Sequence, residues 1–153
     1  QWGPPFLEGV NGDTEESGYY LSANRNKRSA EIDLRSSEGR DAILRLLETC
    51  DVLIENFKVG DLARAGLDYA TLARRFPRLV YCSISGFGQS GPNAHRPGYD
   101  LLAQAWGGIM SLTGDPEGEP TKVAVGIVDI MTGMYAATGI LAALRHRDRT
   151  GKG

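Results

Sequence analysis

The chain has 153 residues, of which 41% are apolar and 24% charged, as in an ordinary soluble globular protein. Its formal net charge of -2 at pH 7 argues against a general affinity for nucleic acid. No run reaches the roughly 18 uninterrupted apolar residues that a membrane span needs. We therefore expect neither a nucleic-acid nor a membrane partner.

Two cysteines and two histidines limit the redox and metal chemistry. Cys50 and Cys82 lie in apolar segments and form no C-x-x-C pair. Free, buried thiols are therefore expected rather than a disulfide, which fits a cytoplasmic protein. His95 and His146 lack the spacing of metal ligands, so no metal site is predicted.

The first third of the chain predicts loops, short strands and one helix. The expected elements are a loop over residues 1–18, strands over 19–23, 30–34 and 51–55, and a helix over 37–49. The helix is inferred from apolar residues at helical spacing, and Ser36 or Ser37 is its expected start. The short apolar run at 51–55 is typical of a strand in a parallel sheet.

Strands and helices alternate along the rest of the chain. The expected elements are helices over residues 61–65, 69–76, 99–112 and 130–147, strands over 79–85 and 123–128, and a turn over 113–122. Gly151 is the expected stop of the last helix. The alternation predicts an α/β fold with a doubly wound, mostly parallel sheet. We interpret residues 1–153 as a single partial α/β domain from inside a longer chain.

A glycine loop at residues 86–91 follows the predicted strand over 79–85 and matches the pattern G-x-G-x-x-G. A dinucleotide site needs its third glycine to open a helix, and an acidic residue about 20 residues later at a strand end. Gly91 is followed by a proline-rich stretch without helical period, and Asp115 lies in a predicted turn. This context argues against a dinucleotide cofactor.

Asp129 stands between a predicted strand and the long predicted helix. The positive field and unpaired N–H groups of a helix N-terminus favour an ionised carboxylate there, which is available as a nucleophile or base. The alternative is an aspartate that only caps the helix of a non-catalytic binding domain. Gly126, Gly133 and Gly139 would allow a ligand to approach closely.

Basic residues follow two of the predicted strands. Arg35 and Lys58 stand at the carboxyl ends of these strands, which form the ligand crevice of a parallel sheet. A phosphorylated ligand could bind there. The alternative for each residue is ordinary solvated surface charge.

Six motifs in order resemble the family III CoA-transferases, the group of formyl-CoA and carnitine CoA-transferases. These motifs begin at Asn24 (NRNKRS), Glu31 (EIDLR), Asp51 (DVLIENF), Ser85 (SGFGQSGP), Arg96 (RPGYD) and Asp129 (DIMTGM). The resemblance implies a Rossmann-like large domain, a smaller second domain and a homodimer of interlocked chains. It also implies an acyl-CoA donor, a small carboxylic acid acceptor and no tightly bound cofactor.

The resemblance also assigns roles to residues. Asp129 matches the catalytic aspartate, which forms an aspartyl–acyl anhydride and then an aspartyl-CoA thioester. Backbone donors near Asp129 are expected to hold the oxyanion. Contacts with CoA carry over to Ile32, Asp33, Leu34, Arg35, Asn56, Phe57, Lys58, Arg64, Pro97, Gly98, Tyr99 and Asp100. A lysine that binds CoA in some relatives falls at Pro97, and the neighbouring Arg96 is the candidate to replace it. Arg35 and Arg64 are expected to meet CoA phosphates.

The same superfamily contains α-methylacyl-CoA racemases, which are the main alternative. Racemisation needs two acid–base groups, one on each face of the α-carbon. In racemases a histidine precedes the aspartate that matches Asp100, whereas this chain has Tyr99 there. Tyrosine is a poor base near neutral pH, so the transferase is preferred.

Overall fold

The computed structural model describes residues 5–10 and 12–153. The chain divides into two compact units, residues 1–32 and residues 33–153, and each is described here by itself. The prediction of a single domain stays a prediction.

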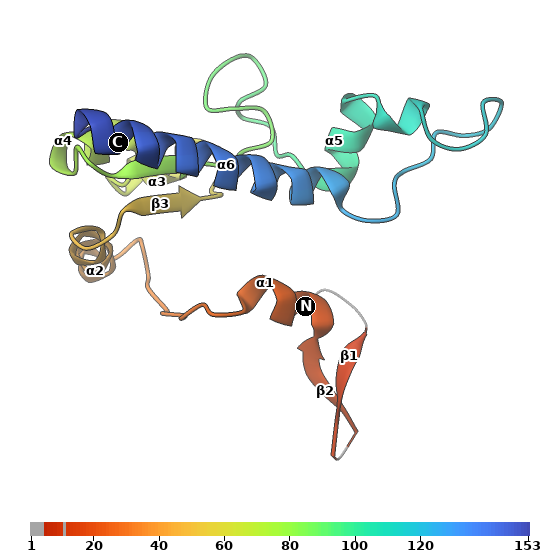
Figure 1. Cartoon of the computed structure of the whole chain (residues 1–153), viewed down its shortest axis with the longest axis horizontal. Helices are drawn as coiled ribbons and strands as arrows, with labels where there is room; N and C mark the ends of the chain where they lie inside the picture. The colour runs from red at the N-terminus through yellow and green to blue at the C-terminus, as the bar shows by residue number, and fades with distance from the viewer. Residues whose placement is uncertain (1–4, 11) are drawn as a thin grey trace. The chain divides into compact units, whose positions relative to one another are not determined.

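The first unit contains a β-hairpin and a helix. Its elements are the strands β1 (Phe6–Gly9) and β2 (Gly12–Ser17) and the helix α1 (Gly18–Asn24) (Figure 1). The strands pair antiparallel, and the Ser17 hydroxyl accepts the N–H of Tyr20 at 3.0 Å to start the helix. The loop predicted over residues 1–18 is therefore wrong for the described part, and residues 1–4 and 11 lie outside it. The strand predicted over 19–23 is also wrong, because this cap turns the backbone into a helix.

The second unit has eight elements among its residues, all of which are described. These are α2 (Ser37–Leu47), β3 (Val52–Glu55), α3 (Asp61–Arg64), α4 (Tyr69–Arg75), β4 (Val80–Ser83), α5 (Asp100–Trp106), the 3-10 helix η1 (Ile109–Ser111) and α6 (Ile127–Thr150). Ser36 caps α2 by accepting the N–H of Gly39 at 2.9 Å. Of the two expected helix starts, Ser36 and Ser37, the structure therefore has Ser36 as the cap. The strand predicted over 30–34 is wrong, since the Asp33 carbonyl accepts the N–H of Ser36 in a turn.

A parallel pair of strands forms the centre of this unit. β3 and β4 run in register from Val52 opposite Val80 to Glu55 opposite Ser83, and α3 and α4 connect them. The buried leucines between strands and helices are Leu47, Leu62, Leu67, Leu72 and Leu79. The helix α6 packs along β4 in Figure 1.

The strand predicted over 123–128 is wrong, and the reason lies in a side chain. The buried Gln104 on α5 accepts the N–H of Val123 at 2.8 Å through its Oε1. Its Nε2 lies 3.5 Å from the carbonyl oxygen of Val125. A glutamine side chain thus takes the place of a neighbouring strand. The helix that follows begins at Ile127, three residues earlier than expected.

The long helix α6 ends as predicted at Gly151, whose φ of 78° a glycine adopts easily. Arg147 near that end donates to the Asp51 carboxylate at 2.8 Å and so joins α6 to the start of β3. By length and hydropathy α6 could cross a membrane, a property that it shares with core helices of soluble proteins. The cysteines are free as expected, but Cys50 is exposed and Cys82 only half-buried, so the prediction of buried thiols is wrong for Cys50.

Candidate active site

Asp129 lies in the first turn of α6 with an exposed side chain. The helix has Gly126 at its N-cap, which offers no side-chain acceptor. The acceptor comes instead from Asp100, which lies 29 residues before Asp129. Its Oδ1 accepts the N–H of Val128 at 2.8 Å and the N–H of Asp129 at 3.2 Å. The alternative in which Asp129 itself caps the helix is therefore wrong.

The other N–H groups of this turn also have acceptors. Ile127 donates to the Val125 carbonyl at 2.8 Å, and Ile130 donates to the Gly126 carbonyl at 3.0 Å. The expectation of unpaired N–H groups around Asp129 is thus wrong, and none of these four is left for an oxyanion. Among the described residues, the Asp129 carboxylate itself forms no hydrogen bond or ion pair. That carboxylate has no structural duty in this part of the protein.

A cavity of about 470 Å³ brings together four residues that the resemblance assigns to CoA, namely Leu34, Arg35, Phe57 and Arg64. The other lining residues are Arg40, Asp61, Leu62 and Ala65. Sequence reasoning missed Arg40, although its place one turn after the Ser36 cap was a usable signal. Three guanidinium groups beside apolar side chains suit a ligand with phosphates and an apolar part.

The three arginines of this cavity differ in their partners. Arg35 donates from Nε to Asp33 at 3.0 Å, a hydrogen bond that raises the pKa of Arg35 and lowers the pKa of Asp33. Arg64 pairs with Asp61. Arg40 donates to the Arg35 carbonyl at 3.1 Å and, within the described residues, pairs with no carboxylate. Arg40 is therefore the cation of this cavity without a carboxylate to compete with a ligand.

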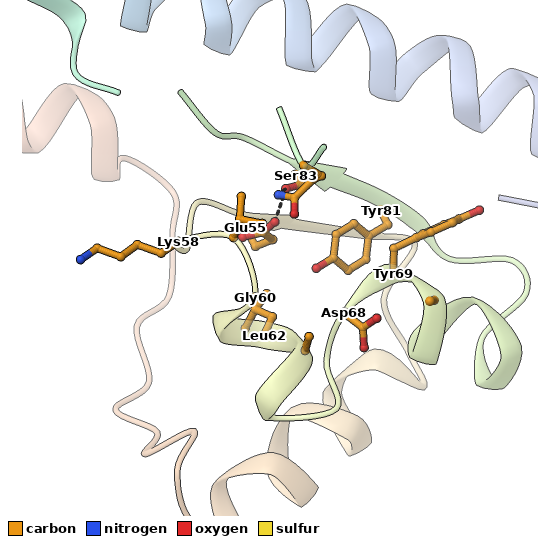
Figure 2. Close-up of a pocket in the computed structure, with 12 residues that line it drawn as sticks. Glu55, Lys58, Gly60, Leu62, Asp68, Tyr69, Tyr81 and Ser83 are labelled. Carbon is orange, nitrogen blue, oxygen red and sulfur yellow. Dashed lines mark hydrogen bonds between the residues drawn. The ribbon is translucent and has the colours of Figure 1, made fainter. Parts of the chain in front are cut away.

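A second cavity, of about 620 Å³, lies at the carboxyl ends of β3 and β4, and Figure 2 shows residues that line it. The buried Glu55 receives the N–H of Phe57 at 2.8 Å on Oε2 and the Ser83 hydroxyl on Oε1. Gln89 of the glycine loop donates to Ser83 Oγ at 2.5 Å. Glu55, which sequence reasoning also missed, thus connects the loop after β3 with the glycine loop. Lys58 extends away from the other labelled side chains in Figure 2.

Two further contacts fix this edge of the sheet. Asn56 donates from Nδ2 to the Ile84 carbonyl at 2.8 Å, which holds the loop after β3 against the end of β4. Tyr81 donates its hydroxyl to the Leu67 carbonyl at 3.3 Å. Burial raises the pKa of Tyr81 to about 12, and the charges of Glu55 and Asp68 add to the effect. The phenol therefore keeps its proton at neutral pH and does not act as a base there.

The glycine loop is held against the segment before α5. Gly86 and Gly98 approach so closely that a Cβ on either would overlap the backbone of the other. Arg96 lies over the rings of Phe87 and Trp106, with its Cζ 5.6 Å and 5.1 Å from their centroids. The loop thus serves as a packing partner for the segment that leads to Asp100, and the Arg96 contact with CoA stays a prediction.

We expect Gly98→Ala to destabilise the enzyme by about 1–3 kcal/mol, as for overpacking. The added methyl group must push the glycine loop away from residues 97–100. Chemical denaturation of the purified variant measures the change. The control is Gly133→Ala, because a Cβ at Gly133 meets nothing within 4 Å. Gly118→Ala is unsuitable, since its Cβ would lie 3.1 Å from Asp115. An equal loss for Gly98→Ala and Gly133→Ala would contradict the packing role.

Three further residues that the resemblance assigns to CoA line neither of these two cavities, namely Ile32, Tyr99 and Asp100. Tyr99 precedes α5 and is 75% exposed, while Asp100 turns to the start of α6. Ile32 belongs to the unit of residues 1–32. The contacts of all these residues with CoA stay predictions.

Comparison with known proteins agrees with the motifs. The chain is 49% identical over 152 residues to a succinate–glutarate CoA-transferase of Agrobacterium fabrum, covering 99% of this chain and 38% of the relative. It is 48% identical to a succinyl-CoA:mesaconate CoA-transferase of Haloarcula hispanica, with 98% and 39% covered. The chain therefore spans about two fifths of the length of these relatives.

A solved structure gives the same result for the fold. The crystal structure of a CaiB/BaiF family protein from Brucella suis matches with a TM-score of 0.89 and 49% identity, over 99% of this chain and 40% of that one. This likeness and the parallel strands confirm the predicted α/β fold class. The family model of CoA-transferase family III matches residues 1–153. The chain belongs to CoA-transferase family III.

Proposed function

We propose that this chain is the catalytic-aspartate and CoA-binding part of an enzyme that moves CoA from an acyl-CoA to a carboxylic acid. The observation that carries the proposal is the exposed Asp129 carboxylate, which has no partner among the described residues of a family III chain. A carboxylate at the start of a long helix that makes no stabilising contact is free to react. The relatives named as CoA-transferases support the same class of reaction.

The proposed reaction is nucleophilic catalysis in two exchanges. An oxygen of Asp129 attacks the thioester carbonyl, the C–S bond breaks, and CoA leaves as a thiolate from a mixed anhydride. The thiolate attacks the aspartyl carbonyl and releases the donor acid, leaving an aspartyl-CoA thioester. The acceptor carboxylate attacks this thioester, its C–S bond breaks, and the thiolate leaves from a second mixed anhydride between Asp129 and the acceptor. The thiolate then attacks the acceptor's acyl carbonyl in this anhydride. Acceptor-CoA forms and the Asp129 carboxylate is restored.

We propose small dicarboxylic acids as donor and acceptor, because the relatives are named for succinate, glutarate and mesaconate. We also propose a cytoplasmic homodimer without a tightly bound cofactor.

The test of the proposed substrates is a screen of the enzyme, expressed from its complete reading frame, with succinyl-CoA and a set of carboxylic acids. New CoA thioesters are expected by mass spectrometry. Exchange of the α-proton in deuterated water without an acceptor acid would instead indicate a racemase.

For Arg40→Ala we expect the KM for acyl-CoA to rise by about 10- to 100-fold with little change in kcat. The physical reason is the loss of a charge-assisted hydrogen bond to a CoA phosphate, which contributes about 1.5–3 kcal/mol. Steady-state kinetics at saturating acceptor acid measures both constants.

The matched control is Arg45→Ala, an exposed arginine on the same helix that lines neither cavity. It should leave the KM unchanged. An Arg40→Ala enzyme with the KM of the wild type would refute the assignment of this cavity to CoA phosphates.

A further inference from the structure

The start of α6 is held by a side chain that is distant in sequence. One carboxylate oxygen of Asp100 accepts two consecutive N–H groups, those of Val128 and Asp129. Its other oxygen accepts a hydrogen bond from Gln104 Nε2 at 2.5 Å. Asp100 and Gln104 are four residues apart on α5 and thus share a face of that helix. The backbone of Asp129 is therefore tied to α5.

Gln104 is the fixed end of this arrangement. Its side chain is fully buried, at 0% exposure. Both the oxygen and the nitrogen of its side-chain amide form hydrogen bonds. Oε1 accepts the N–H of Val123 at 2.8 Å, which holds the segment leading into α6. This bond also sets the orientation of the amide, since only Nε2 then faces Asp100. The glutamine therefore presents a donor to a carboxylate.

The charge of Asp100 suits this position. Burial by itself raises the pKa of the carboxyl, but the hydrogen bonds from Gln104, Asp129 and Val128 and the charge of Lys122 outweigh it, so the pKa is lowered. An ionised carboxylate at the start of a helix is favoured by the helix dipole. Asp100 thus remains a negatively charged acceptor at neutral pH.

We propose that Asp100 and Gln104 form a clamp that positions Asp129 for attack on the thioester, a role that rests on the proposed function. The clamp fixes the first turn of α6 through the N–H of Asp129 while leaving its carboxylate free. It gives Asp100 a positioning role where the family resemblance implies a CoA contact. A small displacement of a nucleophile costs about 100-fold in rate, so loss of the clamp should act on kcat.

Complementary substitutions test the clamp in the enzyme expressed from its complete reading frame. Asp100→Asn places an NH2 group against Gln104 Nε2, and Gln104→Glu places a carboxylate against Asp100. Each single variant is expected to lower kcat by about 10- to 100-fold, with the KM for acyl-CoA within about twofold of the wild type. The double variant Asp100→Asn/Gln104→Glu restores a donor–acceptor pair and should recover most of the rate. Asp115→Asn, an exposed aspartate that accepts a backbone N–H in a turn, is the matched control.

The possible results separate the clamp from other roles. A higher KM with unchanged kcat for Asp100→Asn would show a CoA contact and overturn the clamp, as would single variants with wild-type kcat. If a single variant does not fold, the double variant decides, because a folded double variant below a tenth of the wild-type kcat contradicts the pairing. Hydroxylamine trapping of the wild type shows a failure of the proposed function separately. If Asp129 is not labelled there, the nucleophile assignment falls, whereas a failed clamp leaves that label intact.

Discussion

Replacing Asp129 by asparagine in the enzyme expressed from its complete reading frame is expected to lower kcat by about 10⁴-fold or more. An amide cannot form the anhydride or the thioester, so both exchanges stop. Stability should change by no more than about 0.5 kcal/mol, because the exposed carboxylate has no partner within the described residues. Transfer kinetics and chemical denaturation measure the two effects.

The control for this variant is Asp148→Asn, an exposed aspartate on the same helix. It should keep full activity. A binding domain in which Asp129 only caps a helix predicts the reverse: function stays intact in both variants, and Asp129→Ala loses about 1 kcal/mol of stability. That outcome would contradict both the nucleophile and the capping by Asp100.

Glu55→Ala is expected to reduce the free energy of unfolding by about 2–6 kcal/mol. The carboxylate is 7% exposed and accepts the Phe57 N–H and the Ser83 hydroxyl. Its removal leaves both donors without an acceptor in a low-dielectric site, which costs about 1–3 kcal/mol per group. Because Phe57 is a predicted CoA contact, the KM for acyl-CoA should also rise.

Two further variants make this prediction specific. Glu55→Gln keeps one carbonyl oxygen for the Phe57 N–H and should lose less stability than Glu55→Ala. Glu119→Ala removes an exposed carboxylate and should have little effect. Equal unfolding free energies for Glu55→Ala and the wild type would refute the role of Glu55 in holding the two loops together.

Local signals in the sequence predicted much of the second unit. Ser36 and the helical spacing after it predicted α2, and the apolar runs predicted β3 and β4 with their helical connection. These elements are determined by caps and periodicity within a few residues. The prediction of a strand over 19–23 was wrong because the Ser17 cap starts a helix in that segment.

The arrangement around Asp129 could not be predicted in the same way. The β-branched run at 123–128 is typical of a strand, but its backbone is bonded by Gln104, about 20 residues earlier. The first turn of α6 is capped by Asp100 rather than by a neighbouring residue. Side-chain contacts of this kind depend on how α5 packs against α6. No local sequence pattern encodes that packing.

The candidate site shows the same division. Arg35 and Arg64 were predicted from the family motifs, and the structure places them around one cavity. Arg40 and Glu55 were missed because each looks like an ordinary charged residue next to a helix start or a strand end. Their significance comes from the guanidinium of Arg40, which pairs with no carboxylate among the described residues, and from the burial of Glu55. Only the folded chain reveals these two features.

Covalent trapping at Asp129 tests the central claim most directly. The enzyme expressed from its complete reading frame is incubated with succinyl-CoA, treated with hydroxylamine or borohydride, digested and examined by mass spectrometry. We predict modification at Asp129 as the hydroxamate or the reduced alcohol, and none in the Asp129→Asn variant. An active enzyme in which Asp129 stays unmodified while acyl-CoA is turned over would contradict the covalent mechanism.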